Sequence, residues 1–183
     1  MRLIGLILTI LTMSVEARIA AFAQQVGADI KELRERPEIS CYDAAGELNL
    51  NNTPQVVLMT DDSVIDAEGF TRVGGVITFQ QDARVKIEGW TVVETIDNAG
   101  GVRGAPQLQG QINDIDEPGM IGKGYIRENA AGLLSAQITI RKILNVNAGD
   151  TFRMMLHDTV GNEPNEETLP GASGIMIETR RLL

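Results

Sequence analysis

From Val73 onward the chain is a succession of short segments with the two-residue periodicity of β-strands, separated by turn residues. The clearest segment spans residues 134–141, where Leu, Ala, Ile and Ile alternate with Ser, Gln, Thr and Arg. Such alternation places apolar side chains on one face of a strand and polar side chains on the other. Because no amphipathic helix lies between these segments, the pattern predicts a mainly β protein, a β-sandwich or jelly roll.

Several other segments have the same strand periodicity. A candidate strand lies at 56–59, and Gly89-Trp90 predicts a bulge or turn in the alternating pattern between 85 and 96. Residues 98–101 and 147–150 have the composition of turns. The remaining expected strands are 76–79, 120–127, 151–157 and 175–179.

Charge divides the chain at Pro37. Residues 1–37 carry five basic and four acidic side chains, and residues 38–183 carry 11 basic and 21 acidic ones, so the net charge of −9 is concentrated after Pro37. We expect no binding to nucleic acid, because the chain is acidic and has no basic stripe. The hydrophobic fraction of 43% is enough for a core, and the single cysteine, Cys41, excludes an intrachain disulfide and a cysteine-based zinc site.

Residues 1–13 form an apolar segment, in which Arg2 is followed by an uncharged run at 3–13. Its run of 11 residues is shorter than the ~20 needed to cross a bilayer, so no membrane span is expected. We expect this segment to insert into a partner protein. Two alternatives are a secretory signal cleaved near 21–23 and an upstream start with Met13 as the usual initiator. The anchoring side chains would be Leu3, Ile4, Leu6, Ile7, Leu8, Ile10 and Leu11.

Residues 14–37 have helical periodicity. Ser14 can cap the helix, Glu16 lies in the first turn where the helix dipole favours an anion, and Pro37 ends it. Apolar residues at spacings of three and four form one narrow seam with charged flanks, which favours a self-associating coiled-coil stem over packing on the chain's own domain. The stem is short, so the following domain would oligomerise with it. The seam comprises Val15, Ile19, Phe22, Val26, Ile30 and Leu33.

Two acidic clusters contain the residue types of chemical sites. Asp114, Asp116 and Glu117 precede Pro118-Gly119 and could serve a polysaccharide depolymerase, which needs two carboxylates with different pKa values. Solvated acids in a Pro-Gly loop are the favoured interpretation. The second cluster lacks the ligand spacing of a calcium-binding hand and is interpreted as loop charge. It comprises Asp61, Asp62, Asp66 and Glu68.

The remaining chemistry-bearing residues are few. His157 is the only imidazole, so a metal or anion site would need three copies to converge on a trimer axis. Trp90 is expected in the core and not as a sugar-stacking platform. We therefore assign no catalytic, metal or cofactor-binding residue and expect no enzyme activity. The candidate recognition loop comprises Glu163, Asn165, Glu166 and Glu167.

Three segments carry a family resemblance. Residues 144–156 resemble the late hairpin of the tumour-necrosis-factor-like and complement-globular-head jelly rolls, in which a strand enters a Gly-Asp turn and leaves as another alternating strand. Residues 124–126 resemble the Gly-Tyr strand entry of that family, and residues 173–177 resemble its closing strand. The resemblance covers roughly residues 110–183 and implies a jelly-roll head.

Residues 13–33 resemble the short helical stems of bacteriophage fibre and appendage proteins, which are commonly trimers. This resemblance implies a virion location and a homotrimer that contacts other capsid or tail proteins and a host-surface glycan or protein. The expected protein is a trimeric head fibre or capsid decoration. Alternatives are a tail-fibre tip or receptor-binding protein, a polysaccharide depolymerase and a secreted jelly-roll ligand module. The expected regions are an anchor at 1–13, a stem at 14–37, a linker with one candidate strand at 38–70 and a jelly-roll head at 71–183.

Overall fold

The computed structural model describes residues 14–34, 36–95, 103–127, 135–160 and 166–182. The chain divides into two compact units, Met1–Arg36 and Pro37–Leu183.

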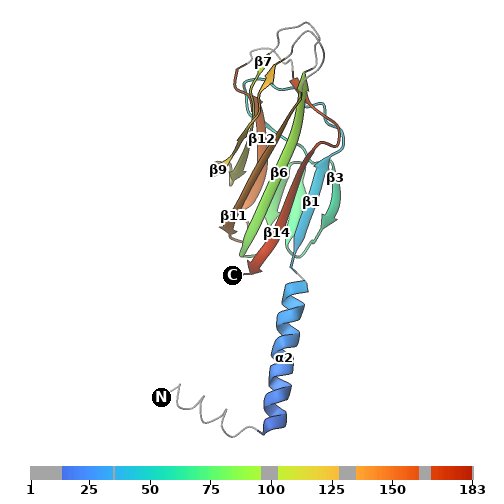
Figure 1. Ribbon diagram of the computed structural model, residues 1–183, viewed down its shortest axis with the longest axis vertical. Coiled ribbons are helices and arrows are strands. Elements are labelled where there is room, and N and C mark those ends of the chain that lie inside the picture. The colour runs from blue at the N-terminus through green and yellow to red at the C-terminus, as the bar shows by residue number, and fades with distance from the viewer. Residues whose placement is uncertain (1–13, 35, 96–102, 128–134, 161–165, 183) are drawn as a thin grey trace. The chain divides into compact units, whose positions relative to one another are not determined.

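The first unit contains helix α2, Val15–Arg34 (Figure 1). The Oγ of Ser14 accepts a hydrogen bond from the Ala17 N–H at 3.2 Å, and Glu16 lies in the first turn. The predicted N-cap is therefore confirmed. The helix ends at Arg34, a little before Pro37, since a proline drives the preceding residue out of the α region.

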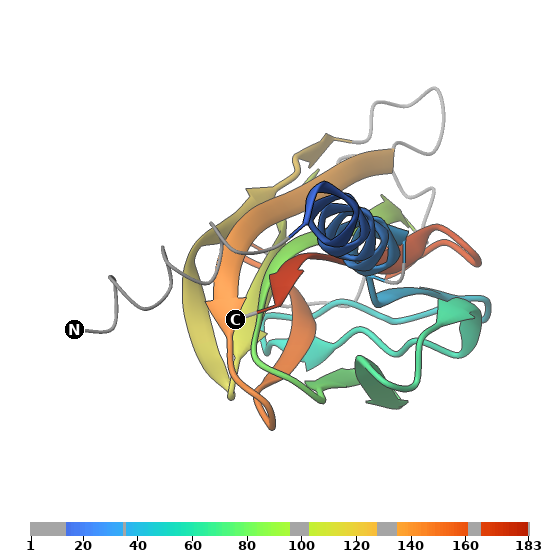
Figure 2. The same cartoon turned by 90° about the horizontal axis from the view of Figure 1, so that it is seen from below.

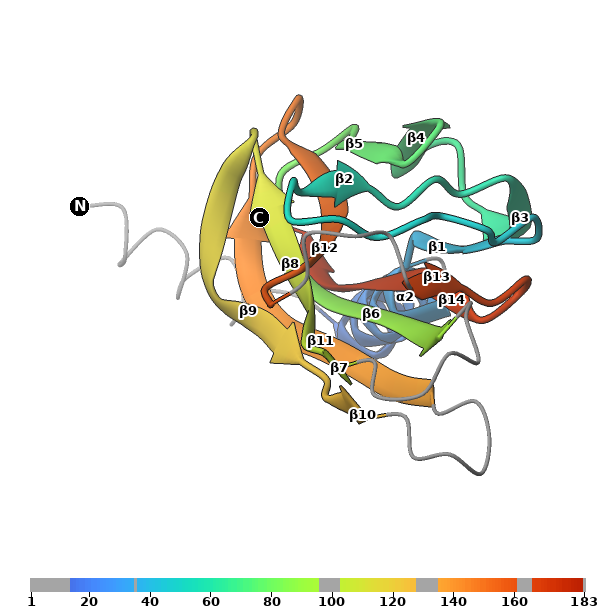
Figure 3. The ribbon, with the colours of Figure 1, turned by 90° about the horizontal axis from the view of Figure 1, so that it is seen from above.

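The second unit is a sandwich of two antiparallel sheets (Figures 1, 2 and 3). Sheet 1 has the order β11 (Ser135–Val146), β6 (Ala83–Thr95), β14 (Ser173–Leu182), β1 (Glu38–Asp43) and β3 (Asp61–Ile65), and β13 (Glu166–Thr168) also pairs with β6. Sheet 2 has the order β4 (Phe70–Val73), β5 (Val76–Phe79), β12 (Thr151–Asp158), β8 (Pro106–Ile112) and β9 (Ile115–Lys123), and β2 (Gln55–Val56) also pairs with β12. A further pair is formed by β7 (Arg103–Gly104) and β10 (Ile126–Arg127).

The core lies between the inward faces of the two sheets. Alternate residues of β6 and β12 supply much of it, including the fully buried Val85 and Ile87 from sheet 1 and Phe152 and Leu156 from sheet 2. This is the alternation that predicted a sandwich. The predicted strands at 76–79, 151–157 and 175–179 lie in β5, β12 and β14, and residues 135–141 of the strand predicted at 134–141 lie in β11, while residue 134 lies outside the described residues. The mainly β prediction is confirmed.

The predicted turn at 147–150 is also confirmed. Asp150 Oδ2 accepts the backbone N–H of Asn147 at 2.8 Å, and Asp150 Oδ1 accepts the side-chain amide of Asn113 at 2.8 Å. These hydrogen bonds, the backbone one foremost, lower the pKa of Asp150.

The structure differs from the sequence prediction in residues 38–70, at Gly89 and in the turn near Pro118. Residues 38–70, expected to be a linker with one candidate strand, supply β1, β2 and β3, and β2 covers only the first residue of the candidate strand at 56–59. No bulge occurs at Gly89, because β6 continues through it with Gly89 paired to Ile140 and Ile175. Glycine is needed there for space, since a Cβ would lie 2.3 Å from the Sδ of Met154.

The turn expected around Pro118 lies earlier in the chain. Asn113 and Asp114 have φ values of 51° and 65°, and they connect β8 to β9 as a tight hairpin. Asn and Asp tolerate the left-handed conformation that such a hairpin requires. Consequently Asp116, Glu117 and Pro118 belong to strand β9 and not to a loop.

Candidate functional site

The seam of α2 is exposed. The exposed fractions are 71% for Val15, 63% for Ile19 and 71% for Phe22, and Ile30 is 46% exposed. Val26 is half-buried, and the side chain of Leu33 lies outside the described set. At about 100° per residue, the described seam residues fall within about 80° of one another around the helix. The helix thus presents one apolar stripe to its surroundings.

The N-terminal anchor residues, all between 3 and 11, lie outside the described residues. Within the described part of the chain, no helix is long and apolar enough to cross a membrane.

The candidate recognition loop is only partly described. Glu163 and Asn165 lie outside the described residues, whereas Glu166 and Glu167 belong to strand β13. Pairing with β6 sets Glu166 opposite Thr95 and directs it inward, so that Glu166 is 2% exposed. A loop-tip role for Glu166 is therefore wrong. Glu167, opposite Glu94, is partly exposed on the other face of the strand.

The carboxylates considered for a depolymerase are each paired. Asp114 Oδ1 lies 3.0 Å from Arg153 Nη1, and Asp116 Oδ1 accepts the side-chain amide of Gln111 at 2.7 Å. Glu117 forms an ion pair with Lys142 across to β11. These contacts join neighbouring strands and leave no two of the acids facing each other across a cleft in the described residues.

His157 lies on the outward face of β12, opposite Gln107 of β8. Its Nδ1 atom is buried and has no hydrogen-bond partner in the part of the chain that the structure describes, and burial lowers the pKa of the imidazole. Over the described ranges, no three His, Cys, Asp or Glu side chains are grouped closely enough to hold a metal ion.

The acidic cluster at 61–68 has a structural role that its sequence did not indicate. Asp61 and Asp62 lie in β3 of sheet 1, and Asp62 makes a two-point ion pair with Arg72 of β4 in sheet 2, at 2.5 and 2.8 Å. The Arg72 guanidinium also donates to the carbonyls of Met59 and Gly74. The hydrogen bond to Asp62 raises the pKa of Arg72. This side chain connects the edges of the two sheets.

Replacing this arginine tests that connection. Arg72→Lys keeps the charge but loses the planar fork that reaches Asp62 and two carbonyls, and we expect the free energy of unfolding to fall by about 1–2 kcal/mol. Urea titration at neutral pH measures the change. Arg84→Lys, at an exposed position of β6, is the matched control and should change stability little. Equal stability of the two variants would contradict the connection.

Trp90 lies on the outward face of sheet 1 and not in the core, which corrects the expectation from sequence. Its indole covers Gly174 of β14, where a Cβ would lie 2.3 Å from Cζ2. Tyr42, Gly174 and Trp90 occupy one row across β1, β14 and β6. The side chains of Tyr42 and Trp90 are half-buried, as is that of Met176 on the same face of β14. We call Tyr42, Trp90 and Met176 the aromatic patch.

Charged side chains flank the aromatic patch on the same face. Glu88 lies 2.9 Å from Lys86 and 3.1 Å from Arg141, so it joins β6 to β11. Glu178 of β14 lies 3.1 Å from Arg180 and 3.8 Å from Lys86. Sheet 1 therefore presents an outward face with an apolar part and a paired-charge part.

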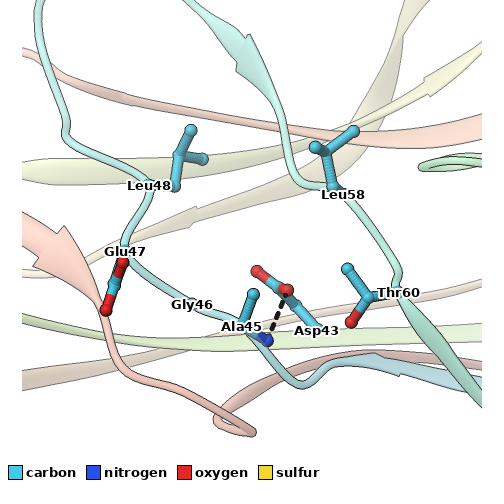
Figure 4. Close-up of a pocket in the computed structure, with 7 residues that line it drawn as sticks. All are labelled: Asp43, Ala45, Gly46, Glu47, Leu48, Leu58 and Thr60. Atoms are coloured by element: carbon cyan, nitrogen blue, oxygen red, sulfur yellow. Dashed lines mark hydrogen bonds between the residues drawn. The ribbon is translucent and has the colours of Figure 1, made fainter.

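A small pocket of about 190 Å³ opens beside β1 (Figure 4). Two of its polar side chains are engaged by backbone amides: Asp43 accepts the Ala45 N–H at 3.2 Å, and Thr60 accepts the Ala44 N–H at 2.8 Å. The pocket is smaller than the ~300 Å³ typical of small-molecule sites. Its lining is Asp43, Ala45, Gly46, Glu47, Leu48, Leu58 and Thr60. We assign no ligand to it.

Comparison with known proteins identifies the fold. No family model matches the chain, and no curated protein matches it. Crystal structures of murine APRIL at pH 5.0 and pH 8.0 match with a TM-score of 0.50 and 8% identity, covering 79% of this chain and 99% of the other. A third, at pH 8.5, matches with the same TM-score and coverage at 7% identity. At this identity the likeness concerns the fold alone, and the second unit has a tumour-necrosis-factor-like jelly-roll fold.

Proposed function

We propose that the protein is a non-catalytic homotrimer in which a helical stem associates and a jelly-roll head presents a binding surface. The exposed seam of α2 carries this proposal. Phe22 and Val15, each 71% exposed, belong to an apolar stripe that has charged neighbours on both sides. A stripe of this shape is typical of helices that associate with copies of themselves.

The outward face of sheet 1 supports the same proposal. Tryptophan, tyrosine and methionine are enriched at protein interfaces, and all three form the aromatic patch. The head and stem would then bury apolar surface in one assembly, which offsets the short length of the stem. Ion pairs around Glu88 and Glu178 would form the polar rim of that contact.

The setting we propose is a bacteriophage particle. The stem resembles those of phage appendages, and the apolar segment 1–13 would attach the trimer to a capsid or tail protein. The acidic head would extend outward toward a host-surface glycan or protein, and its excess of negative charge would suppress nonspecific adsorption to anionic surfaces. The short stem favours a head fibre or capsid decoration over a tail fibre.

The oligomeric state gives the first test. Mass photometry of the full chain should give about three times the protomer mass of 19.8 kDa. A monomer that persists at micromolar concentration would overturn the proposal. The virion location is tested separately, by labelling purified particles with an antibody to the head and viewing them by electron microscopy; unlabelled particles would overturn that part alone.

A secreted ligand-like module is the second candidate. Two observations favour it: Arg2 followed by an apolar run has the shape of a secretory signal, and the head shares the fold of APRIL. Intact mass spectrometry of the natural protein distinguishes the two. Loss of residues near 1–23 would indicate a cleaved signal, whereas their retention supports the anchoring role.

A further inference from the structure

Two buried acids, Glu166 and Asp158, lie near enough at one end of the head for the charge of Asp158 to act on Glu166. Glu166 and Thr95 are directly opposite in the pairing of β13 with β6, and both side chains are buried. Asp158, at the end of β12 in sheet 2, is 4% exposed and also points inward. The end of β6 and the short strand β7 mark this end of the head in Figure 1, and Figure 3 views it from above. We name Thr95, Asp158 and Glu166 the apical acid site.

Among the described residues, three oxygens of this site have no hydrogen-bond partner. They are both carboxylate oxygens of Glu166, which is 2% exposed, and Oγ1 of Thr95, which is 1% exposed. Asp158 is held in place by backbone amides: its Oδ1 accepts the N–H of Ala105 at 2.8 Å and of Val160 at 3.1 Å. Buried polar atoms are nearly always partnered, so these three exceptions among the described residues point to an ordered water or a bound cation.

The position of Glu166 is fixed by the neighbouring strand. A Cβ placed on Gly104 of β7 would lie 1.1 Å from Glu166 Oε1. The Glu166 carboxylate therefore packs against the backbone of β7 at a glycine, where no side chain occupies the space. The threonine hydroxyl is fixed by the strand pairing. The site is therefore built from strands and not from mobile surface side chains.

The electrostatics of the site favour a positive ligand. Burial and the nearby charge of Asp158 raise the pKa of Glu166 to about 7. A proton on Glu166 would also remove the repulsion, so the proton and the cation are the two competing occupants of the site. A cation would neutralise the acids and accept all of these oxygens as ligands.

We propose that Glu166, Thr95 and Asp158 bind a hard divalent cation, Ca²⁺, between the two sheets of the head. Carboxylate and hydroxyl oxygens are the ligands that hard cations prefer, and a carboxylate that offers two oxygens suits Ca²⁺ better than Mg²⁺. The site supplies fewer protein oxygens than the about six to eight that Ca²⁺ takes, so water completes the shell. His157 does not contribute, because it points outward from β12.

Calorimetric titration of the chelator-treated full chain with CaCl₂ at pH 7.5 tests the proposal. We expect binding and a rise in melting temperature for the natural sequence, and at least about tenfold weaker binding for Glu166→Gln. Glu167→Gln, the adjacent outward-facing glutamate of β13, is the matched control and should bind as the natural sequence does.

A second variant keeps the test decisive if Glu166→Gln folds poorly. Thr95→Val preserves shape and charge but removes one ligand oxygen, so it should weaken Ca²⁺ binding while leaving the fold intact. Absence of Ca²⁺ binding by the natural sequence up to millimolar concentration would overturn the proposal and leave a proton as the occupant. Equal Ca²⁺ affinity of Glu166→Gln and Glu167→Gln would overturn it as well.

Discussion

A chain that carries both Phe22→Asp and Val26→Asp should sediment as a monomer where the natural sequence sediments as a trimer. Each substitution replaces an apolar seam residue with a charge, and a trimer would bring three copies of each aspartate together on its axis. Burial of a large apolar side chain contributes about 1.5–3 kcal/mol, so the six substitutions of one trimer remove most of the stem's association free energy. Sedimentation velocity at micromolar concentration measures the result.

The opposite face of α2 supplies a control of equal charge. Gln24→Asp with Ala28→Asp adds the same two negative charges at the same spacing, but these positions lie about half a turn around the helix from the seam. We expect this double variant to remain trimeric. A trimer that survives Phe22→Asp with Val26→Asp would show that the seam does not drive assembly, and would transfer that role to the aromatic patch of sheet 1.

The second large effect concerns pH. In the presence of a chelator, the stability of the natural sequence should fall as pH rises from about 4.5 to about 7, because the pKa of Glu166 is raised from 4.5 to about 7 in the folded chain. The stabilising effect of the proton is complete below the unfolded value and is lost as pH passes the folded value. The shift corresponds to at most about 3 kcal/mol.

The measurement is urea unfolding at several pH values, read as the difference between the natural sequence and Glu166→Gln. Glutamine mimics the protonated acid, so this variant should lack the loss above pH 4.5 and be the more stable chain at pH 7.5 without Ca²⁺. The difference cancels the contributions of other groups, including His157 and Asp150. If the free energy of unfolding depends on pH in the same way for the natural sequence and for Glu166→Gln, the pKa of Glu166 is not raised in the folded chain.

Local features of the fold could be predicted from the sequence. The Ser14 cap, the turn at 147–150 and the alternating strands that became β11 and β12 depend on residues close together in the chain. Each is specified by hydrogen bonds or side-chain periodicity within a few residues. The three resembling segments likewise indicated the jelly roll that the structure shows.

Non-local contacts decided the positions of the candidate site residues. Glu166 follows Pro164 and Asn165, which made a loop tip the natural interpretation, yet pairing with β6 turns it inward. The sequence predicted that Asp62 is a solvated loop charge, whereas in the structure it forms an ion pair with Arg72 of β4. Gly89 predicted a bulge, and only the packing of Met154 shows why a side chain is excluded there. The partners in these contacts lie on different strands, so strand periodicity alone does not bring them together.

The sequence by itself determined that this chain has an N-terminal helix with an apolar seam followed by an acidic β unit, because periodicity and charge are properties of consecutive residues. Only the tertiary structure decided which face each head residue occupies. It placed Trp90 outward over Gly174, and it brought Glu166, Thr95 and Asp158 together from three strands. Whether a side chain points into the core or toward solvent depends on how its strand pairs with strands that are distant in the sequence. A shift of one residue in that pairing moves every side chain of the strand to the opposite face of the sheet.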